Sequence, residues 1–252
     1  MKNLLFILFL SFSLSQDYSI NFDGYNDYVS VDHIDSYNNL SEFTWSSWVR
    51  LKPNEFPTEQ NMFIFNKDHT SDYNQSTFSI ALMTNEEPRT LRYNCDIDGS
   101  GSNNSIIQTS LEPFEDFEWH LITATFKSNE TIRFYIDGNL IEEEIAQDGL
   151  IQNTEKLLFG THSSESLSFF NGQIYDFLFL NEALTIEEVN NLYGWGFLAH
   201  TSYENGANNV LAYYMIDNGN GDILYDSSDN QNHGTIYGAE WVEIQEDNIY
   251  CC

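Results

Sequence analysis

Two aspartates stand on either side of a short glycine-containing segment near the start of the chain. Asp23 and Asp27 enclose Gly24-Tyr25-Asn26. Carboxylate oxygens on a turn are hard ligands of the kind that calcium prefers, so this segment is a candidate for part of a calcium site. The alternative is that both carboxylates accept backbone N–H groups of the turn and hold no metal. The residue types leave both interpretations open.

Other groups with metal-binding chemistry are less well placed. The acidic segments 96–99 and 217–222 lack the terminal glutamate of the twelve-residue calcium loop, which favours ordinary turns. The six histidines lack the paired spacing of zinc ligands, so zinc is not expected. They are His33, His69, His120, His162, His200 and His233.

Acidic runs raise the question of glycoside hydrolysis. A retaining glycosidase needs two carboxyl groups about 5 Å apart, which acidic residues alternating along one strand can supply. The runs 112–118 and 142–144 do not alternate on an apolar strand, and the second follows a hairpin, as a solvated edge strand does. No serine or cysteine stands in the context of a nucleophile. We therefore predict that the protein is not an enzyme.

Aromatic residues offer a second kind of chemistry, the recognition of sugars. A sugar ring packs on a flat aromatic side chain, and neighbouring amides and carboxylates bind its hydroxyl groups. Five aromatic residues are predicted on polar strand faces or loops, and each could instead pack within a sheet. These candidate ligand-binding residues are Trp48, Tyr73, Tyr93, Tyr135 and Trp195.

Composition limits the partners. The 252 residues include 39 Asp and Glu against nine Lys and Arg, a formal net charge of −30, which disfavours nucleic acid and anionic lipid. The three cysteines, Cys95, Cys251 and Cys252, are too few for a disulfide framework, although Cys95 could pair with a terminal cysteine. A hydrophobic content of 41% supports a large core.

The first residues resemble a secretory signal peptide. Lys2 precedes the apolar run 4–14, and the small residues Ser13 and Ser15 follow the usual order before a cleavage site. The run is shorter than the roughly 20 residues that cross a bilayer. We therefore expect residues 1–15 to be a signal peptide, the mature protein to be secreted, and no segment to insert in a membrane.

Alternation of apolar and polar residues predicts β-strands through most of the chain. In 43–51 the odd-numbered residues are expected on one face, and Thr44, Ser46, Trp48 and Arg50 on the other. Asp137-Gly138 is typical of a tight hairpin turn. A short helix is predicted after Thr185, because Glu188 completes a capping box. This pattern is that of a two-sheet antiparallel sandwich or jelly roll.

Four blocks of sequence, in order, resemble the laminin G-like, concanavalin A-like family of jelly-roll domains. They are 22–29, 43–49, 119–138 and 170–188, and together they span nearly all of residues 17–193. The resemblance implies an all-β fold, a two-sheet antiparallel jelly-roll sandwich with one short C-terminal helix, over residues 16–193.

The same resemblance bears on calcium, because family members often bind it near the opening and closing strands. Asp23 and Asp27 match the opening motif. In the closing strand the family usually has an acidic pair, but here Tyr175 takes the first place, on the face expected to hold Gln173 and Phe177. Asp176 is then the third candidate ligand.

The end of the chain resembles a stretch that usually stands before the opening strand of this family. Residues 194–209 are expected to form a connecting loop and 245–252 a tail. The strands between them, 210–244, either complete the same sandwich in permuted order or begin a truncated second repeat. Completion is favoured, because no second Phe-Asp-Gly block follows and sandwich termini commonly lie close together.

These observations predict a secreted, non-catalytic module for recognition or adhesion. Its ligand would be a glycan or an extracellular protein on a cell surface or in the matrix, with calcium as a candidate cofactor. Two alternatives remain. One is a structural subunit that self-assembles through edge strands, and the other is a divergent relative of glycoside hydrolases, since a fold alone does not establish activity.

Overall fold

We describe a computed structural model of the protein. The residues described are 18–52, 61–67, 77–84, 88–96, 104–114, 116–149, 153–163, 165, 168–196 and 209–244. The predicted signal peptide, Tyr73, Cys251 and Cys252 lie outside them. Within these ranges, the only α-helix is far too short to cross a bilayer.

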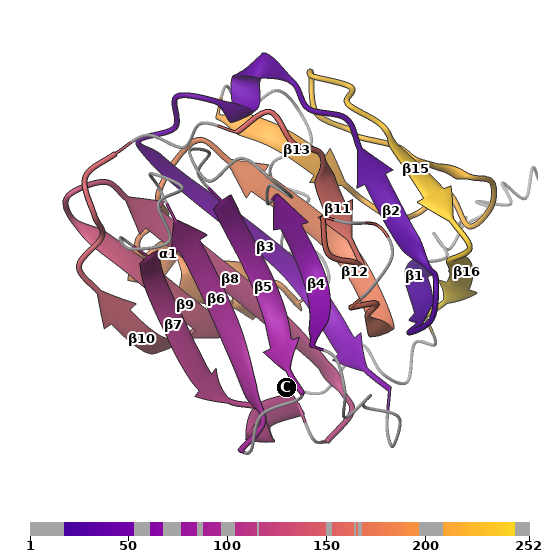
Figure 1. The fold of residues 1–252 in the computed structure, drawn as a ribbon, viewed down its shortest axis with the longest axis horizontal. Helices are drawn as coiled ribbons and strands as arrows, with labels where there is room; N and C mark the ends of the chain where they lie inside the picture. The colour runs from indigo at the N-terminus through magenta and orange to yellow at the C-terminus, as the bar shows by residue number, and fades with distance from the viewer. Residues whose placement is uncertain are drawn as a thin grey trace, which may run out of the picture.

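Two antiparallel sheets stack face to face, with the second sheet nearer the viewer in Figure 1. The first has the order β10-β9-β8-β3-β12-β1-β16, with β13 also paired to β12, and the second has the order β14-β15-β2-β11-β4-β5-β6-β7. The sequence therefore predicted the fold class correctly. The strands are β1 Tyr18–Asp23, β2 Tyr28–Val31, β3 Glu42–Leu51, β4 Met62–Lys67, β5 Thr77–Met83, β6 Thr90–Asp96, β7 Asn104–Ser110, β8 Trp119–Lys127, β9 Thr131–Ile136, β10 Asn139–Glu144, β11 Leu157–Phe159, β12 Asn171–Leu180, β13 Val210–Tyr214, β14 Ile223–Leu224, β15 Gly234–Tyr237 and β16 Glu240–Glu243. Two single-turn 3₁₀ helices lie at Asp35–Tyr37 and Glu112–Phe114.

The core lies between the sheets and is rich in aromatic rings. On β3, Trp45 meets Phe65 and Tyr93 of the second sheet, with ring centroids 4.2 and 5.6 Å apart. Since β3 pairs with β8 without a break in register, the even-numbered residues of β3 face the opposite side of the sheet. The alternation predicted for 43–51 is therefore confirmed, and Trp48 lies on the outer side.

A β-bulge at Asp176 interrupts this alternation in β12. Tyr175 pairs with Trp48, whereas Phe177 pairs with Ser47, and Asp176 between them has a positive φ of 53°. The extra residue moves Phe177 into the core, where it contacts Phe65, while Tyr175 stays on the outer side with Trp48. The expectation that Tyr175 and Phe177 share a face is therefore wrong.

The helix α1, Ile186–Gly194, has the predicted capping box. The hydroxyl of Thr185 accepts a hydrogen bond from the Glu188 N–H, and the Glu188 carboxylate accepts one from the Thr185 N–H. The helix packs on the β9–β10 turn so closely that a Cβ on Gly138 would lie 2.9 Å from the Cβ of Tyr193. It is not C-terminal, because β13 to β16 follow it.

These last strands are built into both sheets. β13 pairs with β12 and β16 with β1, while β15 pairs with β2. The loop after β14 is organised by the buried carboxylate of Asp226. It accepts hydrogen bonds from the backbone N–H groups of Tyr213, Ser228 and Asn232 and from the hydroxyl of Ser228, each 2.9 Å long. Residues 210–244 thus belong to the same sandwich as β1 and β2.

A lysine is completely buried at the end of β4. The Nζ of Lys67 lies 3.1 Å from both the carbonyl and the side-chain oxygen of Asn153, 2.5 Å from the carbonyl oxygen of Glu155 and 3.2 Å from Nδ1 of His33. Burial lowers the pKa of Lys67 to about 7, although the charge of Glu155 opposes the shift. Lys67 therefore fastens the segment before β11 to β4.

Candidate functional site

The turn between β1 and β2 uses its aspartates to bind its own backbone. Oδ1 of Asp23 accepts hydrogen bonds from the N–H groups of Tyr25 at 2.8 Å and Asn26 at 3.4 Å, and Oδ2 of Asp27 accepts one from the Asp23 N–H at 2.9 Å. Burial raises the pKa of Asp27 above its usual value, and the neighbouring charge of Asp23 adds to this, while the hydrogen bond from Asp23 opposes it. Both carboxylates therefore stabilise the turn.

Asp176 does not lie close to Asp23 and Asp27. Asp23 pairs with Asn171 at the start of β12, and Asp176 lies five residues further on, about 16 Å at the usual rise of a strand. Across the described ranges, no three His, Cys, Asp or Glu side chains are grouped so that they could hold one metal ion. Engaged turn carboxylates and a distant third aspartate do not fit a calcium site built on Asp23, Asp27 and Asp176.

Most of the predicted aromatic residues are inside the protein. Tyr93 faces the core against Trp45, and Tyr135 is buried within the first sheet. Trp48 is buried on the outer side of that sheet, where its ring centroid lies 6.0 Å from that of Tyr193 on α1. The expectation that these three side chains are accessible to a ligand is therefore wrong. Trp195, at the end of α1, is 54% exposed.

Two exposed tyrosines and one half-buried tyrosine lie elsewhere, on the outer side of β2 and β15 and just after β14 in the second sheet. We call this surface, formed by Tyr28, Tyr225 and Tyr237, the tyrosine face. Residues of β15 alternate between buried and exposed, which turns Ile236 inward and Tyr237 outward. Tyr237 pairs with Tyr28 on β2, and their rings stack with centroids 4.6 Å apart and planes at 15°. Tyr225 is 43% exposed and Tyr237 is 44% exposed.

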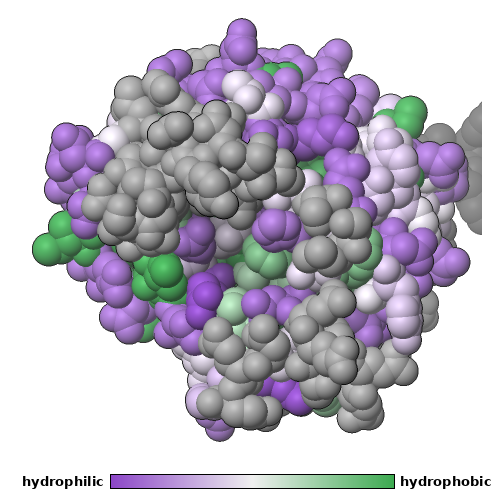
Figure 2. All heavy atoms as spheres, viewed as in Figure 1, coloured by the Kyte–Doolittle hydropathy of each residue, from purple (hydrophilic) through white to green (hydrophobic). Residues whose placement is uncertain are grey.

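Polar groups border both ends of the tyrosine face. The hydroxyl of Tyr28 donates to the Glu165 carboxylate at 3.4 Å, and Lys156 forms an ion pair with Glu165 at 3.1 Å. At the other end, the rings of Tyr225 and His233 meet edge to face, 5.1 Å apart. Nδ1 of His233 accepts the N–H of Asp226 at 3.0 Å, which leaves Nε2 as the N–H donor of the ring. In Figure 2, the described surface over β2 and β15 consists mainly of hydrophilic and intermediate residues.

Sequence reasoning missed this surface because it depends on a long-range pairing. The alternation of 234–237 does indicate that Tyr237 faces outward. Nothing local indicates that Tyr28 will lie beside it, since the two residues belong to strands at opposite ends of the chain.

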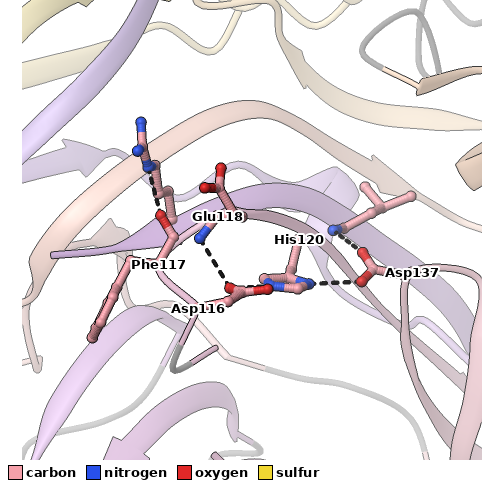
Figure 3. Close-up of polar contacts among 7 residues, drawn as sticks. Asp116, Phe117, Glu118, His120 and Asp137 are labelled. Atoms are coloured by element: carbon pink, nitrogen blue, oxygen red, sulfur yellow. Dashed lines mark hydrogen bonds and ion pairs between the residues drawn. The ribbon is translucent and has the colours of Figure 1, made fainter. Parts of the chain in front are cut away.

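A second polar cluster surrounds His120 at the start of β8, as Figure 3 shows. Nδ1 lies 2.6 Å from Oδ2 of Asp137, and Nε2 lies 3.0 Å from Oδ1 of Asp116. Two carboxylate neighbours require both ring nitrogens to donate, which is the charged imidazolium form. Burial lowers the pKa of His120, but the hydrogen bonds to Asp137 and Asp116 outweigh it and leave the pKa above its usual value.

This cluster joins the β9–β10 turn to the loop before β8. Asp137 also accepts the N–H of Leu121 at 2.9 Å. In the loop, Phe117 has a positive φ of 62°, and its carbonyl accepts a hydrogen bond from Nε of Arg50 at 2.8 Å. His120 therefore has a structural role, because it links the β9–β10 turn to the loop before β8.

The acidic run 142–144 lies in β10, at the edge of the first sheet, with its three glutamates exposed. Arg133 on β9 forms an ion pair with Glu143. This is the solvated edge strand that the sequence predicted, and it keeps other strands from pairing there.

Comparison with known families agrees with this architecture. The profile of Laminin_G_3, described as the concanavalin A-like lectin/glucanases superfamily, matches residues 23–190. The chain belongs to this superfamily. The search of curated proteins finds no match to the chain.

Solved structures of the same fold include proteins of several kinds. One from Bacteroides ovatus, assigned to carbohydrate binding, has a TM-score of 0.65 and 14% identity, and the alignment covers 92% of this chain and 61% of that one. The heptameric SAP-like pentraxin of Limulus polyphemus has a TM-score of 0.51 and 15% identity, over 71% of this chain and 82% of that one. The binding domain of Paraclostridial Mosquitocidal Protein 1 has a TM-score of 0.54 and 18% identity, over 74% and 44%. The chain thus spans about three fifths of the first structure.

Proposed function

We propose that this superfamily member is a secreted, non-catalytic module that recognises carbohydrate through the tyrosine face. The observation that carries the proposal is the stacked pair of Tyr28 and Tyr237 on an accessible sheet surface, with Tyr225 nearby. Aromatic side chains with few rotatable bonds present apolar area at little entropic cost, and their hydroxyl groups remain able to bind polar partners. A sugar presents the same combination of C–H faces and hydroxyl groups.

Preorganisation supports the role. Each ring of the Tyr28–Tyr237 pair restricts the rotation of the other, and the hydrogen bond from Tyr28 to Glu165 restricts it further. A ligand therefore meets side chains that are already in place, which reduces the entropy lost on binding. The strands beneath, β2 and β15, are held by continuous backbone pairing.

The fold and the acidic residues are consistent with binding without catalysis. The B. ovatus protein is assigned to carbohydrate binding, and the pentraxin and toxin domains are also not described as enzymes. The exposed glutamates of β10 lie on an edge strand rather than on the tyrosine face. The signal-like residues 1–15 support the secreted part of the proposal.

A glycan array probed with the full mature chain tests the proposal. Tyr237→Thr removes the ring but keeps a residue suited to a strand, and it should abolish binding. Trp195→Ala, which removes an exposed aromatic ring from α1 on the other sheet, is the matched control and should bind as the wild type does. Circular dichroism would verify that both variants fold. Binding that survives Tyr237→Thr, or binding that is lost in Trp195→Ala, would overturn the assignment.

A further inference from the structure

The tyrosine face has two aromatic positions rather than one. The Tyr28–Tyr237 pair marks the end of β15, and Tyr225 lies against His233, just before the start of β15. His233 and Tyr237 are four residues apart along an extended strand, which corresponds to about 13 Å. This spacing exceeds the reach of one sugar ring but suits a chain of several.

The surface between the two positions is also suited to a chain. The pairing of Ile223 with Thr235 places both on the outer side of the sheet, and both are exposed. Thr235 contributes a hydroxyl group and Ile223 an apolar contact midway between the aromatic positions. A linear ligand lying along β15 would therefore meet apolar and polar groups over its whole length.

Charge decides what kind of chain fits. Lys156, at the border of this surface, forms an ion pair with the Glu165 carboxylate. The hydrogen bond to Glu165 raises the pKa of Lys156, and the charge of Asp32 adds to the increase. Its positive charge is thus already balanced by acidic neighbours. The whole chain carries a formal charge of −30, which repels anions approaching from solution. An anionic glycan would meet repulsion here, whereas an uncharged one would not.

We infer that the tyrosine face binds a linear, uncharged oligosaccharide that contacts the Tyr28–Tyr237 pair and Tyr225 at the same time. This inference rests on the proposed function and specifies its ligand class. Contacts at two linked positions raise affinity much more than either alone, because the second forms at a high effective concentration. We therefore expect affinity to rise at least tenfold between a single ring and a chain long enough to reach both positions.

Titration calorimetry with the full mature chain tests the inference directly. The probes are neutral gluco-, manno- and galacto-oligosaccharides of one to six rings, with oligogalacturonates of the same lengths as the anionic series. At least one neutral series should show the tenfold gain with length, and the oligogalacturonates should bind more weakly at low salt. Tyr225→Thr should remove the gain with length, so that the variant binds short and long chains of the neutral series with about equal affinity.

Matched variants separate ring loss from misfolding. Tyr225→Phe and Tyr237→Phe keep the rings and should keep the length dependence, and Trp195→Ala should leave every affinity unchanged. Equal affinity for one ring and for long chains, or stronger binding of oligogalacturonates, would overturn this inference but leave carbohydrate recognition standing. Failure of every sugar on the array and in the titrations would overturn both.

Discussion

Asp226 tests how the C-terminal strands are held in the sandwich. Its buried carboxylate is the common acceptor for the N–H groups of Tyr213, Ser228 and Asn232 and for the Ser228 hydroxyl. Asp226→Ala removes all four hydrogen bonds and leaves buried donors at Tyr213 and Ser228. Each unsatisfied buried donor costs about 1–3 kcal/mol. We expect the free energy of unfolding to fall by about 3–5 kcal/mol, out of the 5–15 kcal/mol typical of a domain.

A graded series makes the prediction specific. In Asp226→Asn, a side-chain oxygen at the Oδ1 position still accepts from Tyr213 and Ser228, but the amide group opposite the Asn232 N–H cannot accept. This variant should lose about 1–3 kcal/mol. Asp229→Ala, at an exposed position in the same loop, is the control and should stay within about 0.5 kcal/mol of the wild type.

Urea denaturation followed by tryptophan fluorescence measures these differences. The expected order of stability is wild type and Asp229→Ala together, then Asp226→Asn, then Asp226→Ala. The reasoning is refuted if Asp226→Ala unfolds within about 1 kcal/mol of the wild type, or if the asparagine variant is as unstable as the alanine variant. In either case the four hydrogen bonds would not be what anchors this loop.

Three further predictions follow from other sites. The wild type should be more stable than His120→Gln by on the order of 1 kcal/mol, because charged His120 donates to two carboxylates. This difference should be complete below pH 6.5 and should fall as the pH rises through the raised pKa of His120 in the folded protein. Melting curves of the two proteins at each pH measure it. Lys67 should show the opposite pH dependence, because its pKa of about 7 lies below the pKa of a lysine in the unfolded chain. Between pH 7 and about 10, the free energy of unfolding of the wild type should rise by up to a few kcal/mol relative to that of Lys67→Met. A difference between the two proteins that does not change with pH would contradict this. Asp23 and Asp27 already accept hydrogen bonds from backbone N–H groups, so removal of calcium with EDTA should change the affinity for oligosaccharide less than twofold. A calcium-induced rise in melting temperature that Asp27→Asn abolishes would contradict this and indicate a metal site at the turn.

Features determined by neighbouring residues could be predicted from the sequence. The capping box of α1 and the alternation of β3 depend on residues a few positions apart. The turn role of Asp23 was also foreseen as the alternative to metal binding, because an aspartate commonly accepts the N–H two residues on.

Features that depend on distant pairing or on strained backbone could not be predicted. Asp176 adopts a positive φ, a conformation that glycine usually marks in a sequence. No glycine stands at this position, so the local sequence does not indicate the β-bulge in β12. Trp48 follows the strand alternation correctly, yet α1 covers it. The tyrosine face exists only because strands from opposite ends of the chain lie side by side.

That pairing has a consequence for the order in which the protein can be assembled as it is synthesised. Ser19 donates to the carbonyl of Val242, 223 residues away, and Asn232 donates to the carbonyl of Asp32, 200 residues away. While the ribosome is still making the middle of the protein, β1 and β2 each lack a neighbouring strand and expose backbone groups that other chains could pair with. Contacts of such high sequence separation also slow folding. We therefore expect the end of the sandwich that carries the tyrosine face to form last, so that a formed tyrosine face would indicate a completely folded protein.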